Sequence, residues 1–444
     1  MMAQQMETKK GYSARELAVL SLCRLEREGK FGSLEADSAI KKFRLEGAER
    51  ALYTKLFYGV TERRLTLDHV IAVYSDKKPE ELSLEMKNIL RVSVYQILYL
   101  DRVPDYSAVN EGAELAKKYV RKSAASFVNA VLRRVCRDGM PEIRDDGDAA
   151  AYCSVKYSVS PDICRAFIAE FGKEETEKLL SALFRPQYIT LRVNTLRCGR
   201  EELISLLADN GITAVPTEKS PFGVRLCEHV DTTTLLGIVN GLAYIEDEAS
   251  QIAVASLAPR PGEIVADVCA APGGKTVSAA IMMENKGVIY ASDIHENKLK
   301  LIEKTARLCG TDIIRVSCRD GRETDPALIN KCDRVLCDVP CSGLGVLAKK
   351  PDMRYKEYGD DERLIATQRA ILRASARYVK AGGTLVYSTC TVVSRENGEN
   401  VSDFLAQNGD FTLVGSTTLL PHRDGTDGFY VAVMKKDSQI EGNE

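Results

Sequence analysis

Apolar side chains recur at helical spacing through the first 140 residues, and this pattern predicts a run of consecutive helices. Glycines and prolines fall between the runs, where helices are expected to stop. We therefore expect an all-α domain over 1–142. The runs begin with Ala14, Leu17, Ala18, Ser21 and Leu25 and continue at 47–60, 65–74, 83–100, 107–119 and 123–137.

A polar linker at 141–149 precedes a segment in which helical and strand-like patterns are mixed. This mixture predicts a small α+β module over 150–240. Arg192 and Asn194 alternate along a strand-like stretch, so they share one face of that strand. Contact with RNA and a structural polar role are both open for this pair. The module's expected elements are helices at Glu174 to Leu183 and Glu201 to Leu207 and a strand from Ile189 to Thr195.

After residue 240 the pattern changes to short apolar strands that alternate with amphipathic helices. Such alternation predicts a Rossmann-like α/β domain over 241–436 with a mostly parallel, doubly wound sheet. In such sheets ligands bind beyond the carboxyl ends of the strands. Strands are expected at 263–268, 287–292, 312–317, 333–337, 383–389 and 429–435, and helices at 296–309 and 361–379.

Composition and charge narrow the class of protein. The 444 residues suffice for about three domains, and 45% of them are hydrophobic, as in ordinary globular proteins. The net charge of −2 is unevenly spread, with 25 Lys and Arg against 19 Asp and Glu in residues 1–140 and 36 against 44 in the remainder. No stretch has the apolar length of a membrane span or of a signal peptide, so we expect a cytoplasmic protein without a membrane partner.

Thirteen cysteines and four scattered histidines raise the question of disulfides and metals. In a reducing cytosol the cysteines are expected to be free thiols. No C-x-x-C spacing occurs, so no metal site is expected. Thiol chemistry and simple packing remain as explanations for the cysteines.

A loop of small residues follows the first strand of the α/β domain and opens a helix. Small residues let a ligand approach the backbone, and the helix start with its lysine offers positive potential to an anionic group. The Gly-Lys-Thr ending invites a P-loop nucleotide hydrolase as an alternative, but that motif needs glycine where Cys269 stands. The candidate cofactor-binding residues in this loop are Cys269, Ala270, Ala271, Pro272, Gly273, Gly274 and Lys275.

Acidic residues at the ends of the later strands favour S-adenosylmethionine as the cofactor. Asp293 closes the second strand, where a carboxylate can accept the ribose hydroxyls. Asp320 follows the third strand and can accept from the adenine amino group, and Asp338 ends the fourth strand beside the expected reactive centre. One such residue alone would more often be a helix cap or turn former.

Two cysteines lie at neighbouring strand ends, Cys341 after the fourth strand and Cys390 after the fifth. Cytosine chemistry explains a thiol here, because C5 becomes nucleophilic toward a methyl sulfonium only after a thiolate adds to C6. Hydrogen bonding or protonation at N3 would assist that addition, and Asp338 is the candidate acid. Spacing alone leaves open which thiol attacks.

The segment from Cys332 to Gly343 closely resembles the signature of the Nol1/Nop2/Sun family of RNA cytosine-5 methyltransferases. Asp267 to Thr276 is similar to that family's cofactor loop, and Ser388 to Cys390 with Glu396 to Asn400 is similar to its nucleophile loop. The resemblance implies that Cys390 is the nucleophile and that Cys341 helps to release the product.

The basic N-terminal domain resembles NusB-like RNA-binding domains, chiefly from Pro104 to Arg134. With the catalytic domain it resembles the bacterial Sun/Fmu type, which implies a cytosine in an opened or single-stranded element of 16S rRNA as substrate and a monomeric enzyme. A non-catalytic rRNA-binding or assembly factor is the main rival. The basic stripe of the N-terminal domain comprises Lys117, Lys118, Arg121, Lys122, Arg133 and Arg134. Lys349, Lys350 and Arg354 follow the Cys341 loop, and both contact with phosphate and a solvated loop are open for them.

Overall fold

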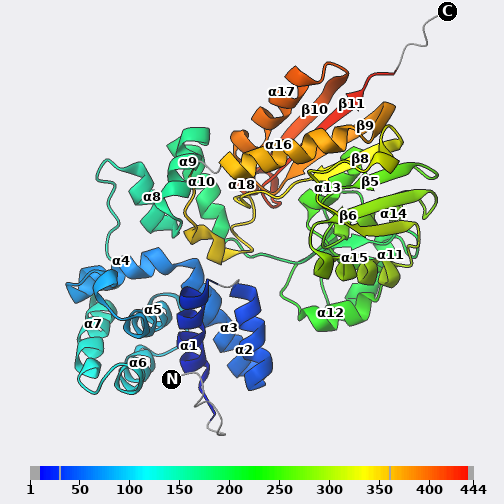
Figure 1. Cartoon of the computed structure of the whole chain (residues 1–444). Coiled ribbons are helices and arrows are strands. Elements are labelled where there is room, and N and C mark those ends of the chain that lie inside the picture. Colours follow the sequence, from blue (N-terminus) through cyan, green and yellow to red (C-terminus); the bar gives the residue numbers. More distant parts are fainter. Residues whose placement is uncertain (1–10, 30–31, 360–361, 439–444) are drawn as a thin grey trace, which may run out of the picture. The chain divides into compact units, whose positions relative to one another are not determined.

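The structure, a computed structural model, describes residues 11–29, 32–359 and 362–438. Two units are distinguished along the chain (Figure 1). One contains the described residues up to Leu180 together with Lys349–Tyr358, and the other contains Ser181–Ala348 and the described residues from Gly359 onward. The chain therefore leaves the second unit after Ala348, contributes a short segment to the first, and returns.

The first unit is helical, as the apolar periodicity predicted. Side-chain oxygens cap several helix starts, including Ser13 at the first helix and Ser83 at the fifth, which satisfies amide groups that have no partner within the helix. The helices are α1 (Ala14–Glu28), α2 (Gly32–Phe43), α3 (Gly47–Glu62), α4 (Arg64–Ser75), α5 (Leu84–Tyr99), α6 (Asp105–Tyr119), α7 (Ala124–Asp138), α8 (Ala149–Tyr157), α9 (Pro161–Phe171) and α10 (Lys173–Ser181).

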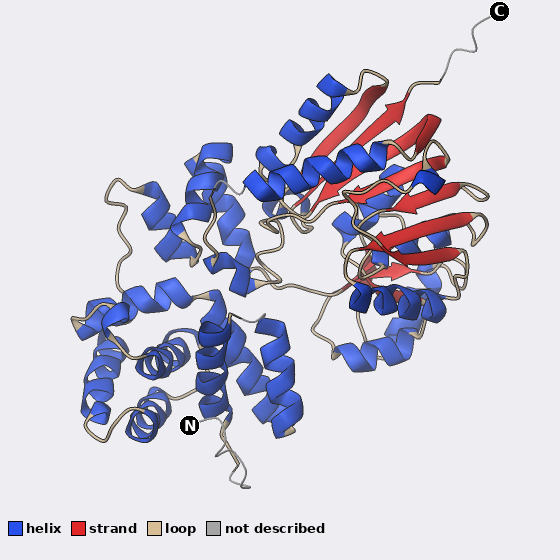
Figure 2. Ribbon diagram, in the orientation of Figure 1, coloured by secondary structure: helices blue, strands red, loops and turns tan. Residues whose placement is uncertain are grey.

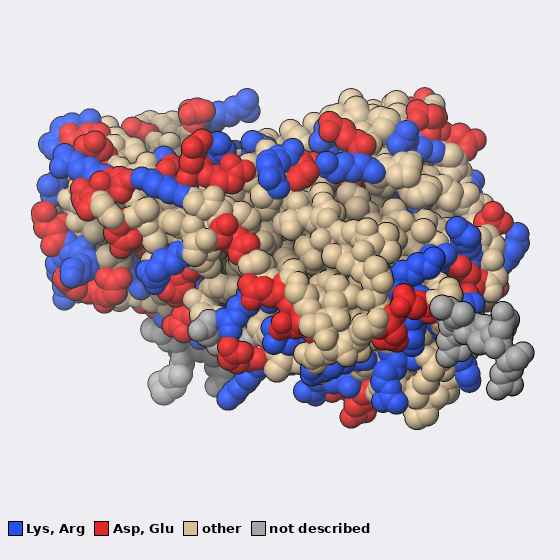
Figure 3. Space-filling model, turned by 90° about the horizontal axis from the view of Figure 1, so that it is seen from above, with Lys and Arg blue, Asp and Glu red and all other residues tan. Residues whose placement is uncertain are grey.

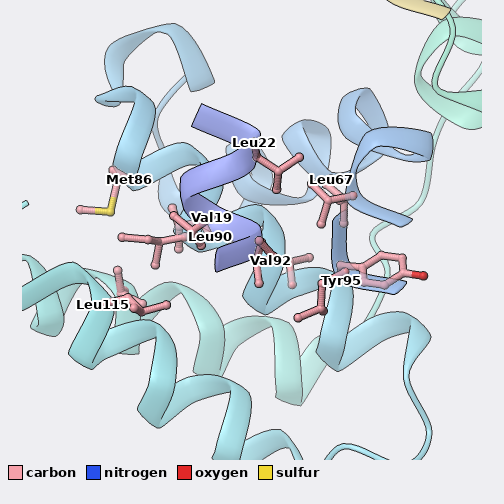
Figure 4. Close-up of a cluster of buried hydrophobic side chains, with 14 of the residues drawn as sticks. Val19, Leu22, Leu67, Met86, Leu90, Val92, Tyr95 and Leu115 are labelled. Carbon is pink, nitrogen blue, oxygen red and sulfur yellow. The ribbon is translucent and has the colours of Figure 1, made fainter. Parts of the chain in front are cut away.

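A single apolar core joins α1 to α7, and α5 passes through its centre (Figure 4). Arg91 of α5 lies at the edge of this core with a side chain that is only 4% exposed. Its guanidinium donates to both carboxylate oxygens of Asp68, at 2.6 and 2.7 Å, and to Glu26 at 2.7 Å. A buried arginine needs such partners, because an unpaired charge in the core is strongly destabilising.

The segment Lys349–Tyr358 corrects part of the sequence interpretation. Its short 3₁₀ helix, η4 (Pro351–Tyr355), packs against α3, and Arg354 is fully buried, donating to the carbonyl of Glu62 at 2.9 Å. The Tyr355 hydroxyl accepts from the Arg64 amide at 3.1 Å and contacts the Thr61 carbonyl. Arg354 is therefore a structural residue of the helical unit and is not available for phosphate contact.

The second unit begins with a four-stranded antiparallel sheet in the order β2-β3-β1-β4. Arg192 on β1 and Asn194 directly after it are both buried: Asn194 donates to the carbonyls of Gly241 and Cys309, and Arg192 donates to Ser278 at 3.2 Å. The structural alternative therefore holds for this pair. The elements are β1 (Thr190–Val193), α11 (Arg200–Asp209), β2 (Ala214–Pro216), β3 (Gly223–Leu226), α12 (Thr232–Val239) and β4 (Ala243–Ile245).

A seven-stranded sheet in the order β10-β11-β9-β8-β5-β6-β7 forms the rest of this unit. The strands from β9 to β7 run parallel, and β11 and β10 add antiparallel pairs at one edge, so the prediction of a mostly parallel sheet is confirmed. The strands are β5 (Ile264–Asp267), β6 (Val288–Asp293), β7 (Ile314–Cys318), β8 (Cys332–Asp338), β9 (Val379–Thr389), β10 (Phe411–Leu419) and β11 (Phe429–Lys436).

Helices cover both faces of this sheet (Figure 2). Because side chains alternate along a strand, Val265 packs with α13 and α14 on one face, whereas Ala266 packs with α16 and α17 on the other. The helices are α13 (Glu248–Leu257), α14 (Gly274–Met282), α15 (Glu296–Cys309), α16 (Glu362–Ala376), α17 (Gly398–Gln407) and the short α18 (Pro421–Asp424).

Candidate active site

Parallel pairing brings the carboxyl ends of β5, β6, β8 and β9 to one edge of the large sheet. Asp267 ends β5, Asp293 ends β6 and Asp338 ends β8, where Asp338 is in register with Ser388 of β9. β5 is the point at which the chain order reverses, since β6 lies on one side of it and β8 on the other. Ligands of such sheets bind at this reversal.

The loop between β5 and α14 fits closely against its neighbours. Gly273 has φ of 105°, and a Cβ there would lie 2.8 Å from the Ile302 Cα. A Cβ on Gly274 would lie 2.9 Å from the Glu246 Oε1 atom. Only glycine therefore fits at either position without movement of its neighbours. The loop reaches β6 through its amides, because Ala271 donates to Asp293 Oδ2 at 3.2 Å.

Asp293 and Asp320 lie against this loop, but each already has partners. Asp293 also accepts from the His295 amide at 2.9 Å. Asp320 accepts a forked set of bonds from Arg322, and these hydrogen bonds lower the pKa of its carboxyl group. The next residue, Gly321, would bring a Cβ within 3.3 Å of the Val268 carbonyl, which places this turn beside the cofactor loop.

Asp267 is a buried acid at the start of the cofactor loop, and sequence alone assigned it no role. Its Oδ2 accepts from Thr276 at 2.7 Å, whereas its buried Oδ1 has no hydrogen-bond partner among the described residues. Burial raises the pKa of Asp267 to about 7. Its place at a strand end was the sequence signal that marks it as part of the site.

Lys275 points to the reactive centre. Its ammonium group donates to Asp338 Oδ2 at 2.8 Å, and Ser388 donates to Asp338 Oδ1 at 2.7 Å. Burial alone would lower the pKa of Lys275, but the charge of Asp338 and the hydrogen bond to it raise the pKa above the ordinary lysine value. Lys275 is therefore ion-paired with Asp338 at the end of β8. From sequence alone we expected it instead to offer positive potential to an anionic group of the cofactor.

The two candidate thiols are in direct contact. The Sγ atoms of Cys341 and Cys390 lie 2.9 Å apart. The hydrogen bond with Cys390, together with burial, raises the pKa of the Cys341 thiol well above its ordinary value. At this distance one thiol can donate its proton to the other sulfur and so stabilise a thiolate there.

Close backbone contact holds the two thiol loops together. The Gly345 amide donates to the Cys390 carbonyl at 3.0 Å, and the Gly428 amide donates to the Gly345 carbonyl at 2.8 Å. A Cβ on Gly345 would lie 1.9 Å from the Gly428 carbonyl oxygen, so glycine is required where these segments meet.

Asp267 and Asp293, at the carboxyl ends of β5 and β6, fit S-adenosylmethionine by their hydrogen-bonding chemistry. The cofactor's ammonium and ribose hydroxyl groups are hydrogen-bond donors, and the unpartnered Asp267 Oδ1 and the spare lone pairs of Asp293 are acceptors.

The basic stripe of the helical unit is partly engaged in ion pairs with carboxylates of the same unit. On the face drawn in Figure 3, positive and negative side chains are interspersed. The pairs in which both partners are exposed, Lys117 with Glu114 and Arg134 with Asp76, contribute little to stability. The pairs are Lys117 with Glu114, Lys118 with Glu16 and Arg134 with Asp76.

Within the described residues, no helix combines the length and the apolar character that crossing a membrane requires. Matches to three protein families follow one another along the chain. The NusB family matches residues 12–137, a ferredoxin-like domain described as Methyltr_RsmF/B-like matches 163–233, and the family described as 16S rRNA methyltransferase RsmB/F matches 254–435.

Relatives match over almost the whole chain. The probable ribosomal RNA small subunit methyltransferase B of Bacillus subtilis (strain 168) is 35% identical, with 96% of this chain and 99% of the relative covered. The ribosomal RNA small subunit methyltransferase B of Pectobacterium carotovorum subsp. carotovorum (strain PC1) is 31% identical, with 97% and 100% covered.

A solved structure has the same fold over nearly the full length. The crystal structure of PH0851 superposes with a TM-score of 0.80 at 27% identity and covers 97% of this chain and 100% of that one. Together with the curated relatives and the three family matches in succession, this shows that the chain belongs to the RsmB/F family of 16S rRNA methyltransferases.

Proposed function

We propose that this protein transfers a methyl group from S-adenosylmethionine to C5 of a cytosine in 16S rRNA, through a covalent adduct between Cys390 and C6. The observation that carries the proposal is the 2.9 Å contact between Cys341 and Cys390 beside the Lys275–Asp338 ion pair. Family membership supports the class of reaction and of substrate, and the two thiols supply the reason for cytosine.

The resemblance to the family's nucleophile loop assigns the attack to Cys390. The contact between the two sulfurs supports this role, because a proton on Cys341 can stabilise a thiolate on Cys390. Addition to C6 moves an electron pair toward N3, where a proton is taken up, and C5 becomes nucleophilic. S-adenosylmethionine supplies the methyl group as an electrophilic sulfonium. When the C5 proton is lost to water, its electron pair re-forms the C5–C6 double bond, the bond between C6 and the Cys390 sulfur breaks, and N3 gives up its proton. Cys341, in contact with the departing sulfur, assists this release.

Asp338 and Lys275 act as one unit toward the base. An ion-paired carboxylate accepts hydrogen bonds, so Asp338 orients the cytosine by accepting from N3–H or from the exocyclic amine. Lys275 holds the proton of the pair, and this proton passes through the Asp338 carboxylate to N3 when Cys390 adds to C6 and returns when the thiolate leaves. Ser388 fixes the other carboxylate oxygen and so sets the direction of Asp338. This division of roles refines the prediction that Asp338 alone is the acid.

The cofactor would be held by the backbone of Cys269, Ala270, Ala271, Pro272, Gly273 and Gly274 and by the acids around it. We propose Asp293 for the ribose hydroxyls, Asp320 for the adenine edge and Asp267 for the ammonium group. Asp338 lies at the boundary between cofactor and base.

The remaining parts of the proposal concern the substrate and the domains. The helical unit would bind phosphates of 16S rRNA with salt-dependent affinity, as the match to the NusB family supports. The three-part division at 1–142, 150–240 and 241–436 stays a prediction, which the successive family matches support. A cytoplasmic location is expected because the proposed substrate is ribosomal RNA, and a monomeric state stays a prediction.

Incubation with labelled S-adenosylmethionine and unmodified, protein-free 16S rRNA tests the proposal. We expect label at C5 of cytosine when the RNA is digested to nucleosides and analysed by mass spectrometry. Label on another base or atom would refute the C5 chemistry. No transfer by folded protein that binds both RNA and cofactor would favour the non-catalytic assembly factor.

A further inference from the structure

We propose that Glu396 is a positioning residue that holds Cys341 in place for product release, an inference that rests on the proposed function. Glu396 ends the short 3₁₀ helix η5 (Ser394–Glu396) after the Cys390 loop, and only 2% of it is exposed. It touches neither thiol in the hydrogen bonds of the site, so it acts through the backbone on either side of Cys341.

The Glu396 carboxylate is linked to the residues on both sides of Cys341, to one directly and to the other through Gln368. Its Oε2 accepts from the Ser342 amide at 2.9 Å, and its Oε1 accepts from the Ser342 hydroxyl. The side-chain amide of Gln368 donates both to Oε2, at 2.8 Å, and to the Pro340 carbonyl, at 3.0 Å. Cys341 is therefore clamped between a directly bound neighbour and a neighbour bound through Gln368.

The frame around Glu396 is itself rigid. The Tyr387 hydroxyl donates to the Glu396 carbonyl at 2.6 Å, and Asn400 donates to the same carbonyl at 3.1 Å. Asn400 also donates to the Gln368 side-chain oxygen at 2.9 Å, which fixes the amide that reaches Pro340. β9, α16 and α17 thus converge on Glu396, β9 and α17 through its carbonyl and α16 through its carboxylate.

The chemistry of the clamp requires both carboxylate oxygens. Ser342 and Gln368 direct three hydrogen-bond donors at them. A buried carboxylate is costly unless its oxygens accept hydrogen bonds. Glutamine has one acceptor oxygen and turns an amide donor toward either Ser342 or Gln368, so the shape is retained and part of the clamp is lost.

The proposed reaction makes the consequence specific. Cys390 forms the bond to C6, and its loop keeps the backbone bond from Gly345 when Glu396 is altered. Cys341 acts at release, where a displacement of about 1 Å can lower a rate by roughly a hundredfold. A weakened clamp should therefore leave adduct formation largely intact and slow its resolution.

The test compares Glu396→Gln with the matched control Glu399→Gln in the full-length protein. Glu399 belongs to the same sequence run but is exposed, with a 3.2 Å bond from Ser394. Each variant is mixed with S-adenosylmethionine and 16S rRNA, quenched in detergent, and assayed for a protein–RNA adduct and for turnover. Circular dichroism and the dissociation constant for the cofactor report on folding and on the cofactor site.

We expect Glu396→Gln to accumulate adduct and to turn over about tenfold or more slowly, with cofactor affinity unchanged. Glu399→Gln should behave as the unaltered protein. Equal losses of adduct formation and of turnover in Glu396→Gln, or adduct accumulation in both variants, would overturn the inference.

A second variant keeps the test decisive if Glu396→Gln does not fold. Ser342→Ala removes the contacts of the hydroxyl with Glu396 and with Thr391 and leaves the amide bond to Glu396, so it should accumulate adduct to a smaller extent. Failure of the proposed function can be told apart from failure of the inference alone. If the proposed function is wrong, Cys341→Ala will trap no adduct. If Cys341→Ala traps RNA while the Glu396 and Ser342 variants do not, only the inference fails.

Discussion

The Lys275–Asp338 ion pair gives the most quantitative prediction of the site. The Nζ and Oδ2 atoms lie 2.8 Å apart, and the side chains are 17% and 24% exposed. At an effective dielectric constant of about 20, two unit charges at this distance attract by roughly 6 kcal/mol. Desolvation of both ions offsets part of this attraction, so we expect a coupling energy of about 2–4 kcal/mol.

A double-mutant cycle with Lys275→Met and Asp338→Asn measures this coupling. Each single variant leaves one largely buried charge without its partner and should lose about 3 kcal/mol of unfolding free energy. The double variant removes both charges and should lose far less than the sum. Ser388 can still donate to the side-chain oxygen of asparagine, so that hydrogen bond does not confound the cycle.

Urea unfolding followed by circular dichroism is the suitable assay, because the chain contains no tryptophan. The transition of the catalytic unit is identified as the one that saturating S-adenosylmethionine moves to higher urea. Losses that add to within about 0.5 kcal/mol would refute a direct interaction between Lys275 and Asp338.

Two further predictions concern buried groups. Burial raises the pKa of Asp267 from 3.8 to about 7, so the folded protein retains a proton that the unfolded chain loses, and stability from this group falls as pH rises from about 4 to 7. Relative to Asp267→Asn, the unaltered protein should lose up to about 1.4 kcal/mol per pH unit in cofactor-free urea titrations between pH 5 and 7, and a constant difference would contradict this. Tyr355→Phe removes a hydroxyl with three hydrogen-bond partners and should destabilise the helical unit by about 1–3 kcal/mol in urea. Tyr74→Phe, which removes one bond, should cost less, and equal losses would refute the assignment.

Local pattern predicted the α/β domain well, because β5, β6 and β8 contain short apolar runs and each of them ends in an aspartate. Asp293 and Asp338 close their strands as expected, and α15 has the predicted bounds. The strand β10 was missed, since it pairs at the sheet edge and most of its residues between Phe411 and Leu419 are exposed. An edge strand lacks the continuous apolar run by which the central strands were found.

The pairings within the site could not be predicted from spacing. Lys275 follows the cofactor loop in sequence, yet its ammonium lies on Asp338, 63 residues later. Glu396 belongs to the segment that resembles the family's nucleophile loop, but its hydrogen bonds to Ser342 depend on how two loops from different strands meet. Arg354 has the sequence context of a phosphate contact and is buried because its segment joins the helical unit. Tertiary proximity decides all three.

Trapping of a covalent protein–RNA adduct tests the central claim most directly. Cys341→Ala and Cys390→Ala are each incubated with S-adenosylmethionine and unmodified 16S rRNA, and the adduct is detected by denaturing electrophoresis. We expect Cys341→Ala to accumulate an adduct, because Cys390 still attacks and release is impaired, and Cys390→Ala to form none. An adduct with Cys390→Ala and none with Cys341→Ala would contradict the assigned roles of the two thiols.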